Sequence, residues 1–372
     1  MSRKTFAIAL GCLSLVCALP TFANDESKAL ESGREYLIAT NYPSNLNIID
    51  LKTDQIYKTC HMPDVFGPGT AQISPDRKTA YVLSNHYGDI YGIDLDSCKT
   101  VFRANLAFKP GERAKAIFSI AVSRDGKEVY SVANPAVLLN DRFTIGTPRL
   151  QVYDTSSGLS ALPVRTFDVP RQISIMQVGH DGSLYMAGAG IYKMDVHSGK
   201  YEIVQPIRNW GRPLYSDPDV LYVWPHQTLT DEFALLYSAV KYQDKSKDPA
   251  TAENVYGQII VDLKTGKTSV QDFATLTELY FTGLRSPKNP GQMFGVLNRL
   301  AKYDIKSKKL IGSATLEHTY YCVAFNKDGS KLYLAGTYNE IAVYDPENLE
   351  RKGTIKLPGG DSALMTAQVF TR

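Results

Sequence analysis

The chain has 372 residues, with 41 Lys and Arg, 38 Asp and Glu, and a formal net charge of +3 at pH 7. This near balance gives no electrostatic reason to expect nucleic acid or an anionic membrane surface as a partner. Tyrosine is abundant at 23 residues, and Thr, Val and Ile fill the apolar runs, a composition that favours strands over helices.

The first residues predict a secretory signal peptide. Arg3 and Lys4 precede an apolar run, and Thr21-Phe22-Ala23 places small residues where a cleavage site requires them. The run is too short for a membrane span, and no later segment approaches 18 apolar residues. We therefore expect cleavage near Ala23 and a soluble protein in the periplasm. The predicted division is a signal peptide at 1–23, an N-terminal extension at 24–34 and one folded domain at 35–372.

A strand that ends in aspartate recurs along the mature chain, as in "NLNIID", "DIYGID" and "RLQVYD". The seven aspartates are Asp50, Asp94, Asp154, Asp195, Asp262, Asp304 and Asp345. Most are 41 to 44 residues apart, and gaps of 60 and 67 residues indicate two insertions. Because an aspartate after a strand accepts backbone hydrogen bonds at a turn, we expect a turn role for these residues rather than chemistry.

A second pattern lies between these copies, with two apolar strands joined by a turn, as in "IAVSRDGKEVYSVAN" and "CVAFNKDGSKLYLAG". Asp125-Gly126, Asp181-Gly182 and Asp328-Gly329 are typical of tight hairpins, because they tolerate positive φ. Each unit then contains four antiparallel strands, a to d. A four-stranded repeat of about 40 to 45 residues is typical of propeller blades. The sequence predicts an all-β fold, a seven-bladed β-propeller.

The two chain ends together predict one blade. "EYLIATN" begins the mature fold as a strand b, so the first blade lacks its strand a. The terminal "LMTAQVF" resembles "GTAQIS", the strand a of the next blade. Because an open ring leaves unpaired strand edges, we expect the C-terminal strand to complete the N-terminal blade.

Four long insertions fall on one face of the predicted ring. The segments 134–148 and 241–257 join strand b to strand c, and 106–116 and 205–219 join strand d to the next strand a. Long loops on a rigid scaffold commonly carry binding residues, and aromatic and arginine side chains are enriched at interface anchors. The candidate loop contacts are Phe143, Arg208, Trp210 and Arg212.

The first residues of each strand a open onto the same face, at the mouth of the central channel. Aromatic residues and histidine gather there in the last three blades. They provide candidate contact residues, although such aromatics also serve simply to plug the channel mouth and pack between blades. These candidates are Trp224, Tyr280, Phe281, His318, Tyr320 and Tyr321.

Catalytic patterns are scarce. The chain lacks Gly-x-Ser-x-Gly, His-Glu-x-x-His and a phosphate loop, and "TCHMPD" lacks the second cysteine that haem attachment requires. The six histidines show no ligand spacing, so we predict no metal site and no catalytic residue. Cys322 lies in the innermost strand "YYCVAF", where we expect a buried, unreactive thiol.

Cys60 and Cys98 are the other two cysteines of the mature chain. Cys60 falls late in a strand d and Cys98 at the c–d turn of the next blade, on opposite faces. Six ladder positions at about 3.3 Å each separate them by roughly 20 Å, beyond the reach of a disulfide. The bond is therefore unexpected, although twist at the rim leaves it open.

Several stretches, loops included, resemble the β subunit of bacterial quinohemoprotein amine dehydrogenase. They are "NYPSNLNIID", "MPDVFGPGTA", "SNHYGDIYGIDLDSCK", "NDRFTIGTPRLQVYD", "GRPLYSDPDVLYVWPHQ", "LTELYFTGLRSPKNP", "LNRLAKYDIKSKKL" and "HTYYCVAFNKDG". The resemblance runs from about residue 35 to the C-terminus. The blade patterns alone indicate only the broad class of bacterial Tyr-Val-Thr-Asn-type propellers.

The resemblance implies a periplasmic heterotrimer that oxidises primary amines to aldehydes and ammonia. A dihaem cytochrome c α subunit and a small γ subunit with cysteine tryptophylquinone would carry the cofactors, and the β propeller would carry none. The family's quinone and its neighbouring base belong to γ, so no catalytic residue transfers to this chain. The propeller would hold γ and help to wall the amine pocket.

Two other functions remain open from the sequence. One is a free-standing envelope propeller that binds a protein or polymer partner. The other is a propeller hydrolase or lactonase with a metal in its channel. The presence of partner subunits would favour the amine dehydrogenase interpretation over both. Metal analysis would test the hydrolase or lactonase interpretation.

Overall fold

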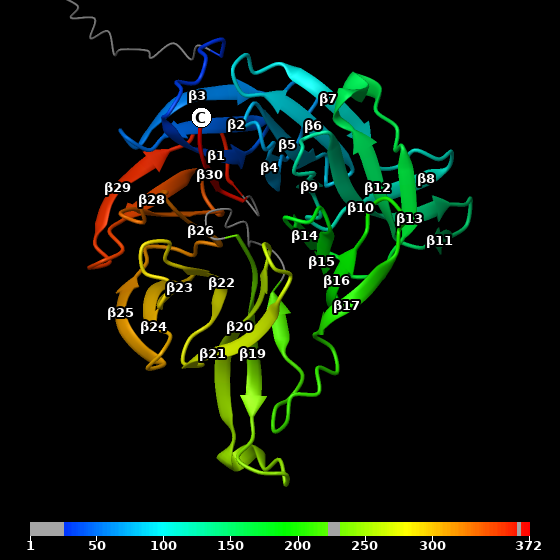
Figure 1. The fold of residues 1–372 in the computed structure, drawn as a ribbon. Coiled ribbons are helices and arrows are strands. Elements are labelled where there is room, and N and C mark those ends of the chain that lie inside the picture. The colour runs from blue at the N-terminus through cyan, green and yellow to red at the C-terminus, as the bar shows by residue number, and fades with distance from the viewer. Residues whose placement is uncertain (1–25, 222–230, 363–365) are drawn as a thin grey trace, which may run out of the picture.

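The computed structural model describes residues 26–221, 231–362 and 366–372. Within these ranges the strands form seven antiparallel sheets arranged around a central axis (Figure 1). The helices described are two short 3-10 turns, Thr155–Ser160 (η1) and Pro249–Thr251 (η2). The predicted all-β, seven-bladed propeller with four antiparallel strands per blade is confirmed.

Five blades use four strands that are consecutive in the sequence, from the innermost strand a to the outermost strand d. Blade two contains β4 (Ala71–Ile73), β5 (Thr79–Ser84), β6 (Asp89–Asp94) and β7 (Thr100–Asn105). Blade four contains β14 (Ile175–Val178), β15 (Leu184–Ala187), β16 (Gly190–Met194) and β17 (Tyr201–Pro206). Blade five contains β18 (Asp219–Leu221), β19 (Glu232–Lys241), β20 (Glu253–Asp262) and β21 (Thr268–Thr275).

The last two blades of this kind follow the same order. Blade six contains β22 (Tyr280–Arg285), β23 (Gln292–Leu297), β24 (Arg299–Asp304) and β25 (Lys309–Thr315). Blade seven contains β26 (Cys322–Phe325), β27 (Leu332–Ala335), β28 (Glu340–Tyr344) and β29 (Arg351–Lys356). Blade three has the core strands β9 (Ala121–Val122), β10 (Glu128–Leu138), β12 (Arg149–Asp154) and β13 (Arg165–Asp168), with β8 (Glu112–Lys115) and β11 (Phe143–Ile145) added to the far end of β10.

The recurring aspartates hold the turns between strands c and d. In every blade the carboxylate accepts a backbone N–H two or three residues later, for example from Ser97 to Asp94 at 2.7 Å and from Lys264 to Asp262 at 2.9 Å. The other five make the same bond. The predicted turn role is confirmed, and it explains why the aspartate is the most regular element of the repeat.

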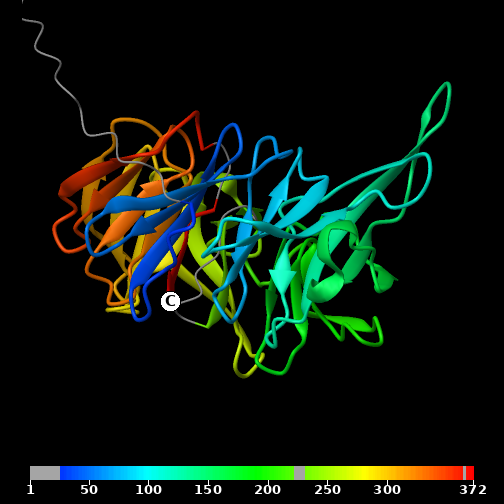
Figure 2. The same ribbon diagram turned by 90° about the horizontal axis from the view of Figure 1, so that it is seen from above.

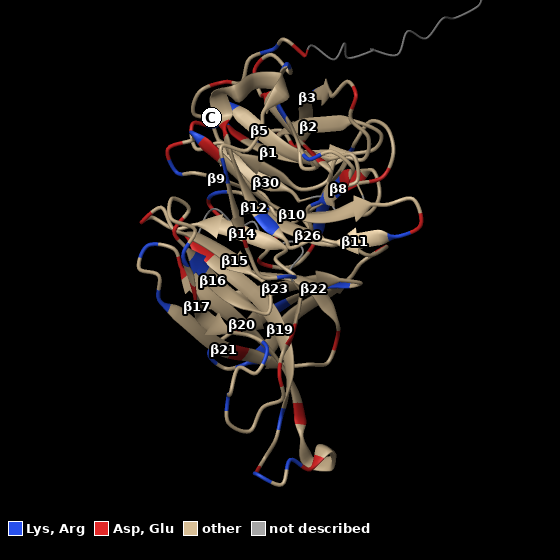
Figure 3. Cartoon of the chain, turned by 90° about the vertical axis from the view of Figure 1, so that its right-hand side faces the viewer, with Lys and Arg blue, Asp and Glu red and all other residues tan. Residues whose placement is uncertain are grey.

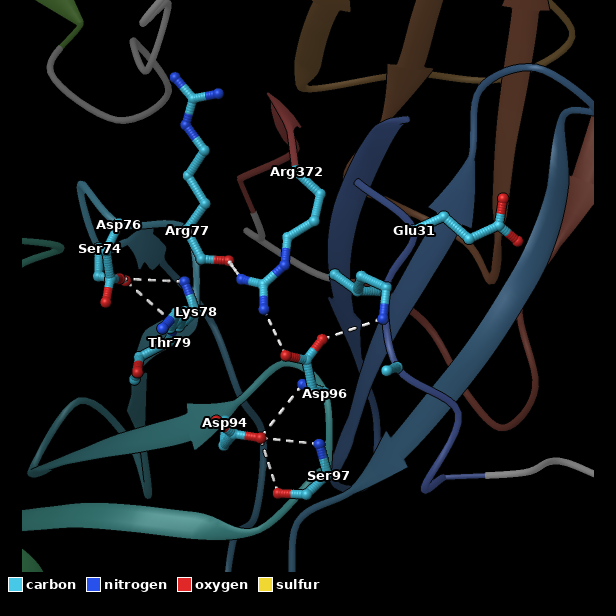
Figure 4. A network of polar contacts seen from close by, with 12 residues as sticks. Glu31, Ser74, Asp76, Arg77, Lys78, Thr79, Asp94, Asp96, Ser97 and Arg372 are labelled. Atoms are coloured by element: carbon cyan, nitrogen blue, oxygen red, sulfur yellow. Dashed lines mark hydrogen bonds and ion pairs between the residues drawn. The ribbon is translucent and has the colours of Figure 1, made fainter. Parts of the chain in front are cut away.

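Blade one is built from both chain ends, as predicted. Its order is β30 (Gln368–Thr371), β1 (Glu35–Asn41), β2 (Asn45–Asp50) and β3 (Gln55–His61). Arg372 donates to the carbonyl oxygen of Arg77 at 2.6 Å and pairs with Asp96, which also accepts the N–H of Leu30 at 2.9 Å (Figure 4). The C-terminus is thus fastened to the N-terminal segment and to blade two.

Cys60 and Cys98 form a disulfide with a Cα–Cα distance of 5.1 Å, so the expectation that they lie too far apart is wrong. The ladder count treated neighbouring blades as flat and parallel, whereas sheet twist turns the outer end of β3 across the β6–β7 turn of blade two. The buried Lys58 shows this approach, because its amine donates to the carbonyl oxygen of Asp96 at 2.6 Å. Cys322 is a buried thiol, as expected, and burial raises its pKa to about 11.

Aromatic side chains fill the spaces within and between blades, often over glycine. A Cβ on Gly257 would lie 2.1 Å from the ring of Tyr237, so only glycine allows that ring to lie flat across β20. In blade two, Gly92 lies between Tyr81 and Phe102 in the same way. The outermost strands keep an alternation of exposed and half-buried residues, as in β25. Packing of the core therefore determines the propeller ring, and the connections between strands are available for binding.

Candidate functional site

The elaborated face carries the b–c and d–a connections. The hairpin of β19 and β20, with η2 at its tip, extends from the ring at the bottom of Figure 1. The extension of blade three, in which β8 and β11 flank β10, stands out from the body in Figure 2. We call the three-stranded extension, residues 112–115 and 134–146, the blade-three arm. Three of the predicted insertions, 106–116, 134–148 and 241–257, therefore contribute ordered β-structure.

Five exposed large apolar side chains lie on this face outside the blade-three arm. Phe66 and Ile117 lie in d–a connections, Leu221 ends β18, Leu279 precedes β22, and Tyr338 lies in a b–c turn. These residues were not predicted, because the candidates came from the long insertions and from aromatic residues and histidine at the strand starts of the last three blades. Most of them could have been recognised in the sequence as apolar residues in connections, where polar residues are the norm. Exposed apolar groups gathered on one face are typical of protein-binding surfaces. We call these five residues the apolar rim.

Phe281 and Tyr321 form the half-buried part of the predicted wall. Their rings lie 5.2 Å apart at 30°, with the two residues at the strand starts of adjacent blades. The hydroxyl of Thr282 donates to the carbonyl oxygen of Tyr321 at 2.6 Å, which ties blade six to blade seven at this point. The two rings therefore form one preorganised aromatic step.

Tyr280 and Tyr320 lie in the interior. Their exposed fractions are 3% and 1%. The hydroxyl of Tyr280 lies 2.7 Å from that of Tyr303, and Tyr320 donates to Glu340 at 2.9 Å. These two candidates are therefore core residues packed between blades rather than part of the exposed surface, as the channel-plugging alternative allowed.

His318 joins a charged cluster beside Tyr320. One ring nitrogen lies 3.0 Å from Glu340, and the ring packs against Tyr320 and the exposed Tyr338. Burial alone would raise the pKa of Glu340, but hydrogen bonds from Lys356, His318 and Tyr320 outweigh it and lower the pKa to about 2. Glu340 is therefore ionised and orients His318 toward Tyr338 at the face.

Trp210 and Arg212 point inward, although both were predicted as loop contacts. The indole N–H donates to the carbonyl oxygen of Ser216 at 2.8 Å, and the guanidinium forms two hydrogen bonds with Asp272, at 2.7 and 3.1 Å. Tyr215 and Tyr237 donate to the same carboxylate. The network tethers the 205–219 segment to β21.

Asp272 is nearly buried, yet it stays ionised. Burial alone would raise the pKa of this carboxyl group, but the hydrogen bonds from Arg212, Tyr215 and Tyr237 lower it below its ordinary value of 3.8. The Arg212 guanidinium also lies 3.7 Å from the centre of the Tyr215 ring. The tether therefore combines an ion pair, two hydroxyl donors and a cation–π contact.

Arg208 and Phe143 do face solvent. Arg208 lines a cleft of about 550 Å³ on the elaborated face, together with Phe118, Asp217 and Leu221. Phe143 lies near the tip of the blade-three arm with 72% of its surface exposed. Trp224, the remaining candidate, lies outside the described residues.

A second cavity, of about 420 Å³, lies at the opposite end of the channel. Gln72 and Gln368 line it from two innermost strands, with Arg77 and Arg124 from a–b turns. One buried amide atom of each glutamine has no hydrogen-bond partner within the described residues. Water is the ordinary ligand of such groups.

Charge and metal-binding groups add no further site. Figure 3 shows Lys and Arg interspersed with Asp and Glu on the side that it presents. Within residues 26–221, 231–362 and 366–372, no group of three or more His, Cys, Asp and Glu could hold a metal ion. In the same ranges, no helix has the length and apolar character needed to span a membrane.

No known family model and no curated protein sequence matches the chain significantly. Solved structures do share its fold. The chain is similar to hydrazine synthase of Kuenenia stuttgartiensis, with 13% identity, a TM-score of 0.53 and coverage of 82% of this chain and 90% of that one. It is also similar to a functionally unknown protein from Desulfotomaculum acetoxidans, with 12% identity, a TM-score of 0.56 and coverage of 90% and 98%. At these identities the likeness shows the fold alone.

Proposed function

We propose that this chain is the non-catalytic propeller subunit of a periplasmic quinohemoprotein amine dehydrogenase. The observation that carries the proposal is the apolar rim, a set of exposed apolar residues on the face that also bears the insertions. A docked subunit would bury these side chains, and burial of apolar surface is the main favourable contribution to subunit association. The resemblance of the loop sequences names the class of complex.

In this proposal the redox groups belong to partner subunits. A dihaem cytochrome c α subunit and a small γ subunit with cysteine tryptophylquinone supply the chemistry that converts a primary amine to an aldehyde and ammonia. This chain carries no cofactor. A propeller of similar fold also occurs in another enzyme, hydrazine synthase.

The chain's own contribution is a rigid, apolar boundary for the amine pocket at the subunit interface. The step of Phe281 and Tyr321 provides the surface, and the hydrogen bond from Thr282 to the carbonyl oxygen of Tyr321 fixes it between blades six and seven. Such a boundary excludes water from the reacting groups of the partner. Arg208, in its cleft, and Phe143, on the arm, are the proposed loop contacts.

The proposal is tested by tagged purification of the chain from the periplasm of its native host grown on a primary amine. We expect a large subunit that stains for covalent haem and a small subunit that stains for quinone redox cycling. If the propeller is recovered alone and colourless, the amine dehydrogenase assignment is wrong, and a free-standing envelope protein that binds a protein or polymer becomes the better function.

Tyr321→Ala tests the aromatic step within that complex. We expect about tenfold lower amine turnover or loss of the γ subunit, because the substitution removes one of the two rings of the step and leaves the backbone bond from Thr282 in place. Steady-state kinetics and subunit stoichiometry provide the measurement. Tyr201→Ala, which removes an exposed tyrosine from the outer strand β17, is the matched control. Equal turnover and composition in both variants would exclude Tyr321 from the site.

A further inference from the structure

The blade-three arm has an unpaired strand edge. Strand β11 pairs with β10 on one side, and within the described residues no strand lies on its other side. The N–H of Gly146 donates to the carbonyl oxygen of Pro135, and the N–H of Leu139 donates to the carbonyl oxygen of Arg142. Pro135 with Gly146, and Leu139 with Arg142, are therefore hydrogen-bonded pairs of the ladder. Hydrogen-bonded and non-hydrogen-bonded pairs alternate in antiparallel sheets. The N–H and C=O groups of Phe143 and Ile145 therefore point away from β10, toward solvent.

The side chains at this edge are apolar and exposed. Phe143 and Ile145 lie on the same face, two residues apart, with 72% and 64% of their surfaces exposed. Leu138, opposite Phe143 on β10, is also exposed. Solvent-exposed edges in monomeric proteins are commonly protected by lysine, proline or a bulge. The residues of β11, Phe-Thr-Ile, contain none of these.

The face of the arm that carries Phe143 and Ile145 also carries basic side chains, on β8, which lies across β10 from β11. Arg113 lies opposite Ala136, which lies opposite Ile145, so these three side chains share one face. Lys115 follows on that face, opposite Asn134. Both cations are exposed, about 10 Å from β11 at two strand spacings.

The carboxylates of the arm do not neutralise these two cations. Glu112 lies on the other face, because it is one residue away from Arg113, and it is paired with the buried Arg149. Asp141, in the hairpin turn, is paired with Arg142. The face therefore combines an apolar edge with two cations that neither carboxylate of the arm neutralises.

We infer that the blade-three arm is a docking site for an extended, acidic and aliphatic segment of another protein, which pairs with the free edge of β11. The partner's backbone bonds to Phe143 and Ile145, its aliphatic side chains cover theirs, and a carboxylate crosses the arm toward Arg113 and Lys115. Addition of a strand to an open edge uses backbone groups for affinity and side chains for specificity. The inference concerns the arm and holds whether or not the partner is an amine dehydrogenase subunit.

The first part of the test identifies the segment bound. Phe143 is replaced by the photo-crosslinking residue benzoylphenylalanine in the full chain, the native host is irradiated, and the cross-linked peptide is sequenced by mass spectrometry. We expect a segment of another protein with alternating aliphatic residues and at least one Asp or Glu. A haem-bearing or quinone-bearing partner would support the proposed function as well, and any other partner would support the docking site alone. Absence of a cross-link, a second copy of this chain, or a segment without acidic residues would overturn the inference.

The second part tests the mode of binding with a synthetic copy of that segment. Ile145→Pro removes the outward N–H but leaves the bonds between β10 and β11, so we expect at least tenfold weaker binding. Ile145→Val retains the donor and should bind within about twofold of the native chain. Arg113→Gln with Lys115→Gln should weaken binding and reduce its dependence on salt. Equal affinity of the proline and valine variants would exclude strand pairing.

Discussion

The 205–219 segment and the blade-three arm are both insertions on the elaborated face, yet they use their aromatic and basic side chains in opposite ways. The first turns Trp210 and Arg212 inward to Ser216 and Asp272. The second leaves Phe143 exposed, and its Arg142 pairs with the neighbouring, exposed Asp141. Similar composition therefore does not imply a similar role.

The difference is explained by what lies beneath each insertion. The buried carboxylate of Asp272 on β21, with the two tyrosine hydroxyls bonded to it, holds the 205–219 segment. Replacing these hydrogen bonds by bonds to water would destabilise the fold. The arm extends beyond the core, and its backbone groups on the outer side of β11 meet only solvent. The arm is fastened at its base, where Glu112 pairs with the buried Arg149, so it is the edge of β11 that remains available for a partner.

The largest expected effect comes from removing the tether. Asp272→Ala leaves the guanidinium of Arg212 and two hydroxyls without their acceptor, and we expect the free energy of unfolding to fall by about 3 kcal/mol. Urea denaturation provides the measurement. Asp141→Ala, which removes the exposed carboxylate–arginine pair in the hairpin turn of the arm, should cause no measurable change, because exposed pairs contribute little. Equal losses in the two variants would contradict the distinction between the insertions.

Acid should loosen the tethered segment next. The folded pKa of Asp272 is below its ordinary value of 3.8, so its contribution is present above that pH and is lost as the pH falls through the folded pKa. In a Trp224→Phe chain, Trp210 is the single tryptophan, and its emission should shift to longer wavelength in that range. The Asp272→Ala variant should already show the shifted emission at pH 7. An emission maximum that is the same in both chains at every pH would refute the tether.

The smallest effect is expected on the arm. Phe143→Ser should change the free energy of unfolding by less than about 0.5 kcal/mol, because the ring is exposed and supports no other group. Trp210→Ser is the comparison, and it should cost considerably more since it removes a half-buried ring packed against Tyr237. Thermal and urea denaturation of both variants would decide the point. A large loss from Phe143→Ser would show that the arm is part of the fold's support.

Much of the elaborated face was predictable, but the direction of its side chains was not. The positions of Phe143 and Arg208 in long connections were sufficient to predict exposure. Tyr280 begins β22 and Tyr320 precedes β26, but both side chains turn into the interior. Arg212 was predicted as a contact because it lies in a long insertion, whereas its partner Asp272 lies 60 residues further along the chain.

The sequence by itself determined the ring. The period of a little over 40 residues, the aspartate that closes each strand c, the Asp-Gly hairpins and the matching chain ends are all local patterns, so they specify seven blades and their closure without knowledge of the packing. Only the tertiary structure decided which distant groups meet. The Cys60–Cys98 disulfide, the Arg212–Asp272 tether and the free edge of β11 depend on sheet twist and on contacts between separate strands, and no repeat period encodes them.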